Sequence, residues 1–205
     1  MPKKYIAIAG NMGTGKSSLV EFLCRHFGLK PFFEPFETNP YLEDFYKEMK
    51  KWAFHSQMYF LSEKFKIHRE LEQYPEPVIQ DRSIYEDAEI YAENCYRGGH
   101  MSVRDYEVYR NFYQTIADAI RPPDLLIYLK CSMSTTRKRI ACRGRDMEVA
   151  IPEDYLRSLN KLYDRWIKGF TRCPVMVYRT DKLDYLSDFI HQQELLEEIG
   201  NRLKI

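Results

Sequence analysis

Residues 10–17 read GNMGTGKS, which fits the phosphate-loop pattern G-x-x-x-x-G-K-[ST]. An apolar run at 4–10, KYIAIAG, comes before the loop, and a helical pattern at 14–28 that ends on Gly28 follows it. Glycines let successive backbone N–H groups turn toward an anion, and the N-terminal end of the following helix adds positive charge. The sequence therefore predicts a strand–loop–helix unit that binds a nucleoside triphosphate.

The loop residues have separate expected roles. Lys16 is expected to reach the outer phosphates of ATP, and the Ser17 hydroxyl is expected to hold Mg²⁺. Ser18 is the next residue and is expected mainly to pack or to cap the helix. We assign nine residues to this part of the ATP site, namely Gly10, Asn11, Met12, Gly13, Thr14, Gly15, Lys16, Ser17 and Ser18.

Apolar runs and helical patterns alternate along the rest of the chain. Further strands are predicted at 30–35, 77–82, 124–130 and 174–180, and helices at 84–99, 103–120, 134–145, 153–170 and 186–203. Residues 39–73 are expected to form one helix capped by Asn39, or two helices that meet near Trp52. This alternation predicts an α/β fold of the P-loop NTPase type, a doubly wound five-stranded parallel sheet with helices on both faces, in a single domain of residues 1–205.

The composition limits partners and compartment. The chain has 205 residues, of which 44% are hydrophobic and 30% charged, and its net charge of +1 gives no electrostatic basis for binding nucleic acid or a membrane. The N-terminus lacks a secretory pattern, and the longest apolar runs are too short to span a bilayer. Five scattered cysteines without a CxxC pair favour free thiols over a zinc site. We therefore expect a cytoplasmic protein that binds neither nucleic acid nor a membrane.

The run QDRSIYED at 80–87 follows the third predicted strand, at the sheet edge where open parallel sheets bind ligands. There Asp81 can hold Mg²⁺ or orient an acceptor hydroxyl, and Arg82 can neutralise charge on a transferring phosphoryl group. Glu34 ends the second predicted strand, where its carboxylate could take a proton from a sugar hydroxyl. An isolated strand-end charge is usually a solvated surface group, but the neighbouring phosphate loop favours a functional interpretation.

Two further groups of polar residues lie on predicted helices. Tyr46, Gln57 and Lys64 are eleven and seven residues apart, so they share one face of a helix that bends little. That face could bind a small polar ligand, or it could belong to an ordinary amphipathic helix. After the fourth strand comes TTRKRIACRGRDME at 135–148, whose arginines predict a lid at about 137–150 that closes over phosphates, with a solvated helix as the alternative.

The loop after the fifth strand, TDKLD at 180–184, suggests a contact with the base of ATP through Asp181, or a polar turn. The chain has no DxxG pattern after a strand and lacks the asparagine of NKxD, which excludes a regulatory GTPase. Three functions then stay open: a nucleoside kinase, a nucleoside monophosphate kinase of the thymidylate type, and a non-catalytic nucleotide-binding protein. Glu34 disfavours the second because its carboxylate would repel the acceptor's phosphate. An intact Lys16 and Asp81–Arg82 pair disfavour the third.

The chain resembles the deoxyribonucleoside kinase family from the phosphate loop to near Trp166. The resemblance rests on an ordered series of stretches: GNMGTGKSS, EPF, Gln57 on the long helix, DRSIYED and RGRDME. The resemblance implies an enzyme, usually a homodimer, that transfers a phosphoryl group from ATP, with Mg²⁺, to the 5′-hydroxyl of a deoxynucleoside. It implies that Glu34 is the general base at that hydroxyl and Arg82 its partner there. Asp81 would lie near Mg²⁺, or would itself accept the proton.

The resemblance also assigns the other site residues to three places. They are expected to hold the 3′-hydroxyl of the sugar (Tyr46, Glu148), to contact the base (Gln57, Asp87, Tyr91) and to bind phosphates from the lid (Arg139, Arg143, Arg145).

One position departs from the family pattern. Members that accept purine deoxynucleosides or deoxycytidine usually have arginine where this chain has Lys64, and lysine keeps the charge but lacks the planar fork. Lys64 is still expected to bind substrate and to pair with Asp87. The runs 39–54 and 80–87 look most like bacterial members that accept deoxyadenosine. Deoxyadenosine is therefore the expected substrate, with deoxyguanosine and deoxycytidine as alternatives.

Overall fold

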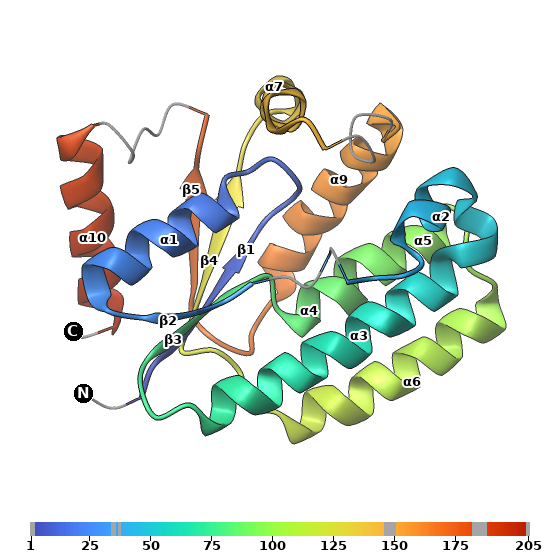
Figure 1. Ribbon diagram of the computed structural model, residues 1–205, viewed down its shortest axis with the longest axis horizontal. Helices are drawn as coiled ribbons and strands as arrows, with labels where there is room; N and C mark the ends of the chain where they lie inside the picture. The colour runs from blue at the N-terminus through green and yellow to red at the C-terminus, as the bar shows by residue number, and fades with distance from the viewer. Residues whose placement is uncertain (1–2, 34–35, 37, 146–150, 182–187, 204–205) are drawn as a thin grey trace.

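The five predicted strands form one parallel sheet in the order β2-β3-β1-β4-β5 (Figure 1). The structure is a computed structural model that describes residues 3–33, 36, 38–145, 151–181 and 188–203. Glu34 and Glu148 lie outside the described residues. The strands are β1 (Tyr5–Ala9), β2 (Lys30–Phe32), β3 (Val78–Asp81), β4 (Leu125–Lys130) and β5 (Val175–Arg179).

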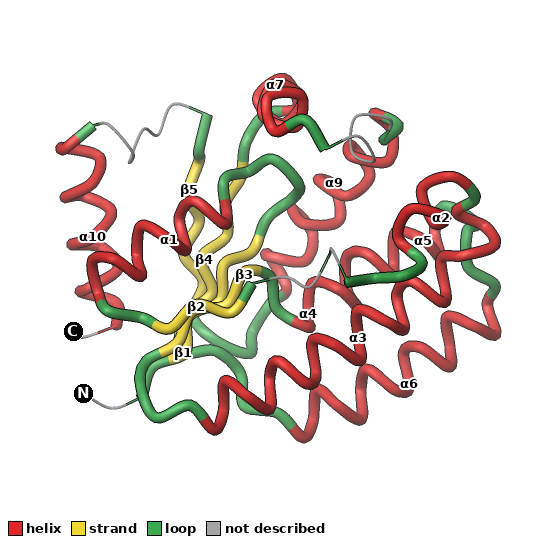
Figure 2. The backbone as a smooth tube through the Cα atoms, in the orientation of Figure 1, coloured by secondary structure: helices red, strands yellow, loops and turns green. Residues whose placement is uncertain are grey.

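The sheet is covered on both faces, which confirms the doubly wound arrangement (Figure 2). Side chains alternate across β1, so that Ile6 and Ile8 belong to one buried cluster while Tyr5 and Ala7 belong to the other. The first cluster packs under α1 (Lys16–Phe27) and α10 (Phe189–Leu203). The second packs under the remaining large helices, α3 (Met49–Gln73), α6 (Val103–Ala119) and α9 (Glu153–Gly169).

The long helical pattern is two helices, and the break lies earlier than we expected. α2 (Leu42–Lys47) ends at Glu48, whose φ of −141° and ψ of 71° are not helical, and α3 begins at the next residue. The ring of Trp52 instead stacks on Tyr41 with 5.7 Å between ring centroids, which packs the residue before α2 against α3. Asn39 is not the helix cap that we expected: α2 begins after Tyr41 and has no side-chain cap, and Asn39 Oδ1 accepts the N–H of Tyr41 at 2.9 Å in the turn before the helix.

A π-helix follows the third strand, a feature that the sequence pattern did not indicate. The chain passes from α4 (Ile84–Glu86) through η1 (Asp87–Ala92) to α5 (Glu93–Arg97). A π-turn winds more residues into each turn than an α-helix, and such segments recur at functional sites. In the remaining crossover, α7 (Met133–Arg143) follows β4 and ends at Gly144 in the left-handed conformation. No helix among the described residues is long and apolar enough to cross a bilayer.

Candidate active site

The phosphate loop has the predicted geometry. It joins β1 to α1, and three of its glycines have positive φ, 150° at Gly10, 72° at Gly13 and 95° at Gly15. A side chain at Gly10 would bring its Cβ within 2.7 Å of the Leu129 carbonyl oxygen. Glycine is therefore required where the loop passes the end of β4.

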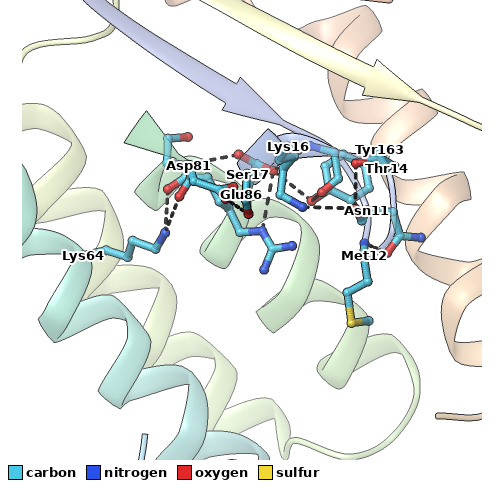
Figure 3. Close-up of polar contacts among 12 residues, drawn as sticks. Asn11, Met12, Thr14, Lys16, Ser17, Lys64, Asp81, Glu86 and Tyr163 are labelled. Atoms are coloured by element: carbon cyan, nitrogen blue, oxygen red, sulfur yellow. Dashed lines mark hydrogen bonds and ion pairs between the residues drawn. The ribbon is translucent and has the colours of Figure 1, made fainter. Parts of the chain in front are cut away.

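The loop residues also bind one another. Thr14 donates its hydroxyl hydrogen to the Asn11 carbonyl oxygen at 2.8 Å, and the Lys16 ammonium donates to the same oxygen at 3.1 Å (Figure 3). The Asn11 amide in turn donates to Asn160 on α9 at 2.7 Å. Lys16 is thus held across the loop, and the loop is held against the helix that follows the arginine-rich segment.

Glu86 anchors the first glycine of the loop, and sequence reasoning missed it. Its Oε1 accepts the Gly10 N–H at 3.1 Å and the Tyr163 hydroxyl at 2.8 Å, and its Oε2 accepts the Ser83 N–H at 3.1 Å. The side chain is fully buried, and this burial raises the pKa of Glu86 although Arg82 and the hydrogen bonds oppose the rise. The S-x-x-E spacing before a helix was the available signal, because it is typical of a residue that reaches back to an N-cap N–H.

Ser17 and Asp81 meet as expected. The Ser17 hydroxyl donates to Asp81 Oδ2 at 2.6 Å, and Oδ1 of the same buried carboxylate has no hydrogen-bond partner among the described residues. Two oxygen ligands beside a phosphate loop are a donor set that suits a hard divalent cation with phosphate and water as its other ligands. The residues present therefore fit a metal ion at this place.

Arg82 has an unusual backbone. Its φ of 62° is the only positive φ among the described residues other than glycine. This conformation costs an ordinary residue about 1–2 kcal/mol, so contacts must hold it. The Arg82 N–H donates to the Ile8 carbonyl oxygen at 2.9 Å, and its guanidinium carbon lies 4.4 Å from the centroid of the Tyr91 ring. Glu86 Oε1 lies 3.9 Å from Arg82 Nε.

Half of the predicted site residues line one cavity of about 470 Å³. Its polar wall runs from the loop to the π-helix. It consists of Lys16, Ser17, Glu21, Thr38, Tyr46, Gln57, Asp81, Arg82, Asp87, Tyr91, Arg143 and Arg145. Gln57 is 2% exposed, and its Oε1 has no hydrogen-bond partner among the described residues. A buried amide at the cavity wall is suited to a ligand that can hydrogen-bond it.

Sequence reasoning missed the aromatic wall of this cavity. The residues concerned are Phe33, Phe36, Phe45, Phe60 and Tyr155, and Phe36 also lies under the guanidinium of Arg145, 3.7 Å from ring centroid to Cζ. Aromatic residues are so frequent in this chain, with 12 phenylalanines and 16 tyrosines, that composition could not single these out. Together they give one side of the cavity an aromatic, largely apolar surface.

Lys64 lies elsewhere than expected. It does not line the cavity, and its ammonium donates instead to the carbonyl oxygens of Asp81 and Arg82, at 3.1 and 2.5 Å. The spacing from Gln57 placed it on the correct helix face. That face packs against the end of β3, so the Lys64 side chain extends to the backbone of Asp81 and Arg82 and not into the cavity.

Arg139 and Asp181 both form contacts within the protein. Arg139 does not line the cavity; its guanidinium donates to the Thr14 carbonyl oxygen at 3.2 Å and to the Thr180 carbonyl oxygen at 2.7 Å, which ties the loop to the end of β5. Asp181 accepts the Ser132 N–H at 2.8 Å, and these contacts at the start of α7 lower the pKa of its carboxyl group. Ser18, which we assigned to the ATP site, does not line the cavity.

Known proteins resemble this chain over nearly its full length. The profile of the deoxynucleoside kinase family matches residues 6–204. A deoxyadenosine/deoxycytidine kinase of Bacillus subtilis is 36% identical over 96% of this chain and 91% of its own length. A deoxyguanosine kinase of Lactobacillus acidophilus is 36% identical over 97% of this chain and 90% of its own length.

Solved structures agree with this result. A deoxyadenosine kinase from M. mycoides with bound dATP superimposes with a TM-score of 0.83 at 34% identity, over 97% of this chain and 99% of the other. The same enzyme with bound dCTP gives a TM-score of 0.82 at 32% identity, over 96% and 98% of the two chains. These comparisons favour an enzyme that phosphorylates a hydroxyl group over a nucleoside monophosphate kinase. On its sequence, its phosphate loop and its fold, the chain belongs to the deoxynucleoside kinase family.

Proposed function

We propose that this enzyme transfers the γ-phosphoryl group of ATP, with Mg²⁺, to the 5′-hydroxyl of a deoxynucleoside, with deoxyadenosine preferred over deoxyguanosine and deoxycytidine. One observation carries the proposal. A single cavity joins the phosphate-binding residues Lys16 and Ser17 to a wall of aromatic side chains that includes the buried amide of Gln57. A triphosphate donor and a small acceptor with a flat base can therefore meet inside it.

The cations of the cavity would stabilise the transferring group. Lys16, Arg82, Arg143 and Arg145 all line it, so their charges surround the place where the negative charge of the phosphoryl group spreads in the transition state. Ser17 and Asp81 would hold Mg²⁺, which neutralises phosphate charge when it is bound. Arg143 and Arg145 belong to the lid that we propose at about 137–150, and closing it would exclude water from the transfer.

We propose Glu34 as the proton acceptor for the 5′-hydroxyl. The preceding residue, Phe33, lines the cavity, and the Asp81 carboxylate is already hydrogen-bonded to Ser17. The hydrogen bond to Ser17 favours a metal-binding role for Asp81. Glu34 is then the carboxylate that accepts the proton of the 5′-hydroxyl. Tyr46 lines the cavity on the same side as the loop residue Met12, whose sulfur its hydroxyl contacts at 3.9 Å, and would bind the 3′-hydroxyl together with Glu148.

Gln57 and Asp87 would read the base. An amide offers both a donor and an acceptor, which matches the adjacent donor and acceptor on the edge of adenine. The Tyr91 ring lines the same cavity and would contact the base there. Support for adenine comes from relatives named as deoxyadenosine kinases, and relatives named for deoxyguanosine and deoxycytidine support the alternatives.

Initial rates of ADP release with ATP test this function. The acceptors are deoxyadenosine, deoxyguanosine, deoxycytidine and thymidine, with the corresponding monophosphates as a second series. We expect turnover with nucleosides and the highest kcat/KM with deoxyadenosine. Turnover with monophosphates alone would overturn the proposal in favour of the thymidylate-kinase type, and ATP binding without any acceptor turnover would favour a non-catalytic protein.

We further propose that the enzyme is a cytoplasmic homodimer that pairs through α6. Val108 and Phe112 lie one helical turn apart on this helix and are 47% and 59% exposed. Exposed large apolar groups on one helix face are typical of an interface. The five cysteines are free thiols, in keeping with a reducing compartment.

A further inference from the structure

Lys64 is a fully buried cation on α3, next to the end of β3. Its ammonium donates to the carbonyl oxygens of Asp81 and Arg82, and among the described residues it forms no ion pair (Figure 3). Taking an ammonium out of water is costly unless polar groups replace the water. Two backbone carbonyls are the groups that do so here, which makes their place in the chain important.

The two carbonyls belong to the peptide groups on either side of the Arg82 Cα. The Arg82 backbone is the one with φ of 62°, and its N–H is bound by the Ile8 carbonyl oxygen. All four polar groups of these two peptides are therefore held: Lys64 binds both carbonyl oxygens, the Ile8 carbonyl accepts the Arg82 N–H, and Glu86 Oε2 accepts the Ser83 N–H. Without the ammonium, both carbonyl oxygens would be buried without this donor, and the left-handed turn would lose two of its hydrogen bonds.

The turn determines where the Arg82 side chain points. The guanidinium lies against the Tyr91 ring and lines the cavity, whereas Lys64 does not reach the cavity. A backbone change to the ordinary right-handed or extended region would rotate the Cα–Cβ bond away from this direction. Lys64 can thus act on the transferring group without touching it.

We propose that Lys64 is a positioning residue that holds the left-handed turn at Arg82, and that it does not read the base. This inference rests on the proposed function, in which Arg82 stabilises the phosphoryl group during transfer. The two roles predict different kinetics. A base-reading lysine affects KM by factors that depend on the base, whereas a residue that positions Arg82 affects kcat by one factor for every deoxynucleoside.

The test compares Lys64→Met with Gln57→Leu, each of which replaces a polar side chain by an apolar one of similar size. We expect Lys64→Met to lower kcat by about 10- to 100-fold, by the same factor with deoxyadenosine, deoxyguanosine and deoxycytidine, and to change each KM by less than about threefold. Gln57→Leu should raise KM by different factors for the three bases. A base-dependent rise in KM with kcat retained in Lys64→Met would overturn the inference.

A crystal structure of Lys64→Met separates this inference from the proposed function. We expect the φ of Arg82 to leave the positive region in this variant. An unchanged φ would contradict the positioning role of Lys64, even if the wild type were no nucleoside kinase. If Lys64→Met does not fold, Lys64→Arg replaces it, because arginine restores the residue typical of the family. Improved base discrimination in Lys64→Arg at unchanged kcat would overturn the inference, and a base-independent fall in kcat would support it.

Discussion

Ser17 and Asp81, 64 positions apart in sequence, share a 2.6 Å hydrogen bond between the first turn of α1 and the end of β3. The bond places a hydroxyl oxygen and a carboxylate oxygen side by side at the mouth of the phosphate loop. The second Asp81 oxygen has no hydrogen-bond partner among the described residues. A divalent cation bound to the donor phosphates would find protein oxygen ligands already in place.

Ser17→Ala should therefore weaken Mg²⁺ binding, so that catalysis needs a higher Mg²⁺ concentration. We expect the Mg²⁺ concentration at half-maximal rate to rise by about 10- to 100-fold, because one oxygen ligand is lost. Steady-state rates over a Mg²⁺ series measure this shift. Thr115→Ala removes an exposed hydroxyl on α6 that binds the Asn111 carbonyl oxygen, and it serves as the matched control. Equal Mg²⁺ requirements in Ser17→Ala and the wild type would contradict the assignment.

Glu34→Gln should affect turnover and not ATP binding. An amide cannot take the hydroxyl proton, so we expect kcat to fall by about 100-fold or more, with the Kd for ATP close to that of the wild type. Single-turnover rates and calorimetric titration with ATP measure the two quantities. If Asp81 were the base, Asp81→Asn would show this pattern at saturating Mg²⁺ and Glu34→Gln would not. Parallel losses of turnover and ATP affinity in Glu34→Gln would also refute its role.

Two arginines of α7 should differ in their effects although they are one turn apart. Arg143 lines the cavity, so Arg143→Met is expected to lower kcat by at least about tenfold. Arg139 ties the Thr14 carbonyl to the end of β5, so Arg139→Met should raise the KM for ATP and lower the Tm. Kinetics and thermal unfolding of both variants test the contrast. Identical profiles for the two variants would mean that both arginines bind phosphate.

His68 should make stability depend on pH. It is 1% exposed and contacts Tyr5 and Glu72, and burial lowers its pKa below the usual value while Glu72 opposes the shift. The unfolded chain therefore binds a proton below about pH 6.5 before the folded chain does, and stability falls as pH decreases from there. The loss is at most about 1.4 kcal/mol for each pH unit until the folded histidine also protonates.

Urea unfolding at pH 7.5, 6.5 and 5.5 measures this slope, with His68→Gln as the comparison. The variant should lose less free energy of unfolding over this range than the wild type, because its side chain does not titrate. A wild-type slope equal to that of His68→Gln would show that His68 does not contribute.

The proposed dimer predicts a clear effect of charge on α6. Phe112→Glu should convert the protein to a monomer in sedimentation velocity experiments, because burying an unpaired carboxylate in an interface is costly. Val177→Glu introduces the same charge on β5 at a residue that is 53% exposed, similar to Phe112, and should leave the dimer intact. A wild type that sediments as a monomer, or dissociation caused by Val177→Glu alone, would contradict the proposed interface.

The sequence predicted those parts of the site that depend on local pattern and on strand order. The phosphate loop is a short motif in its required context, and its roles follow from neighbouring residues. Asp81 and Arg82 could be placed beside it because parallel strands end at one edge of the sheet. Of the three arginines predicted after β4, Arg143 and Arg145 line the cavity and Arg139 does not.

The parts that the sequence did not predict depend on how side chains pack. Helical spacing predicted the correct helix face for Lys64. Its long side chain could extend either into the cavity or to the end of β3, and its hydrogen bond to the Arg82 carbonyl oxygen places it at the end of β3. The π-helix at Asp87–Ala92 and the positive φ of Arg82 are local departures from regular geometry that no period reveals. Glu86 resembled an ordinary helix cap, and only the fold brings Gly10 and Tyr163 to its carboxylate.

The central claim is that this chain moves the last phosphoryl group of ATP to the 5′-hydroxyl of a deoxynucleoside. The most direct measurement follows a radioactive γ-phosphoryl group from ATP into product, with Mg²⁺ and deoxyadenosine present. We predict that the label appears in deoxyadenosine 5′-monophosphate, and that none is transferred to an analogue without the 5′-hydroxyl. Label found only in a diphosphate when deoxyadenosine monophosphate is supplied, with none transferred to any deoxynucleoside, would contradict the account.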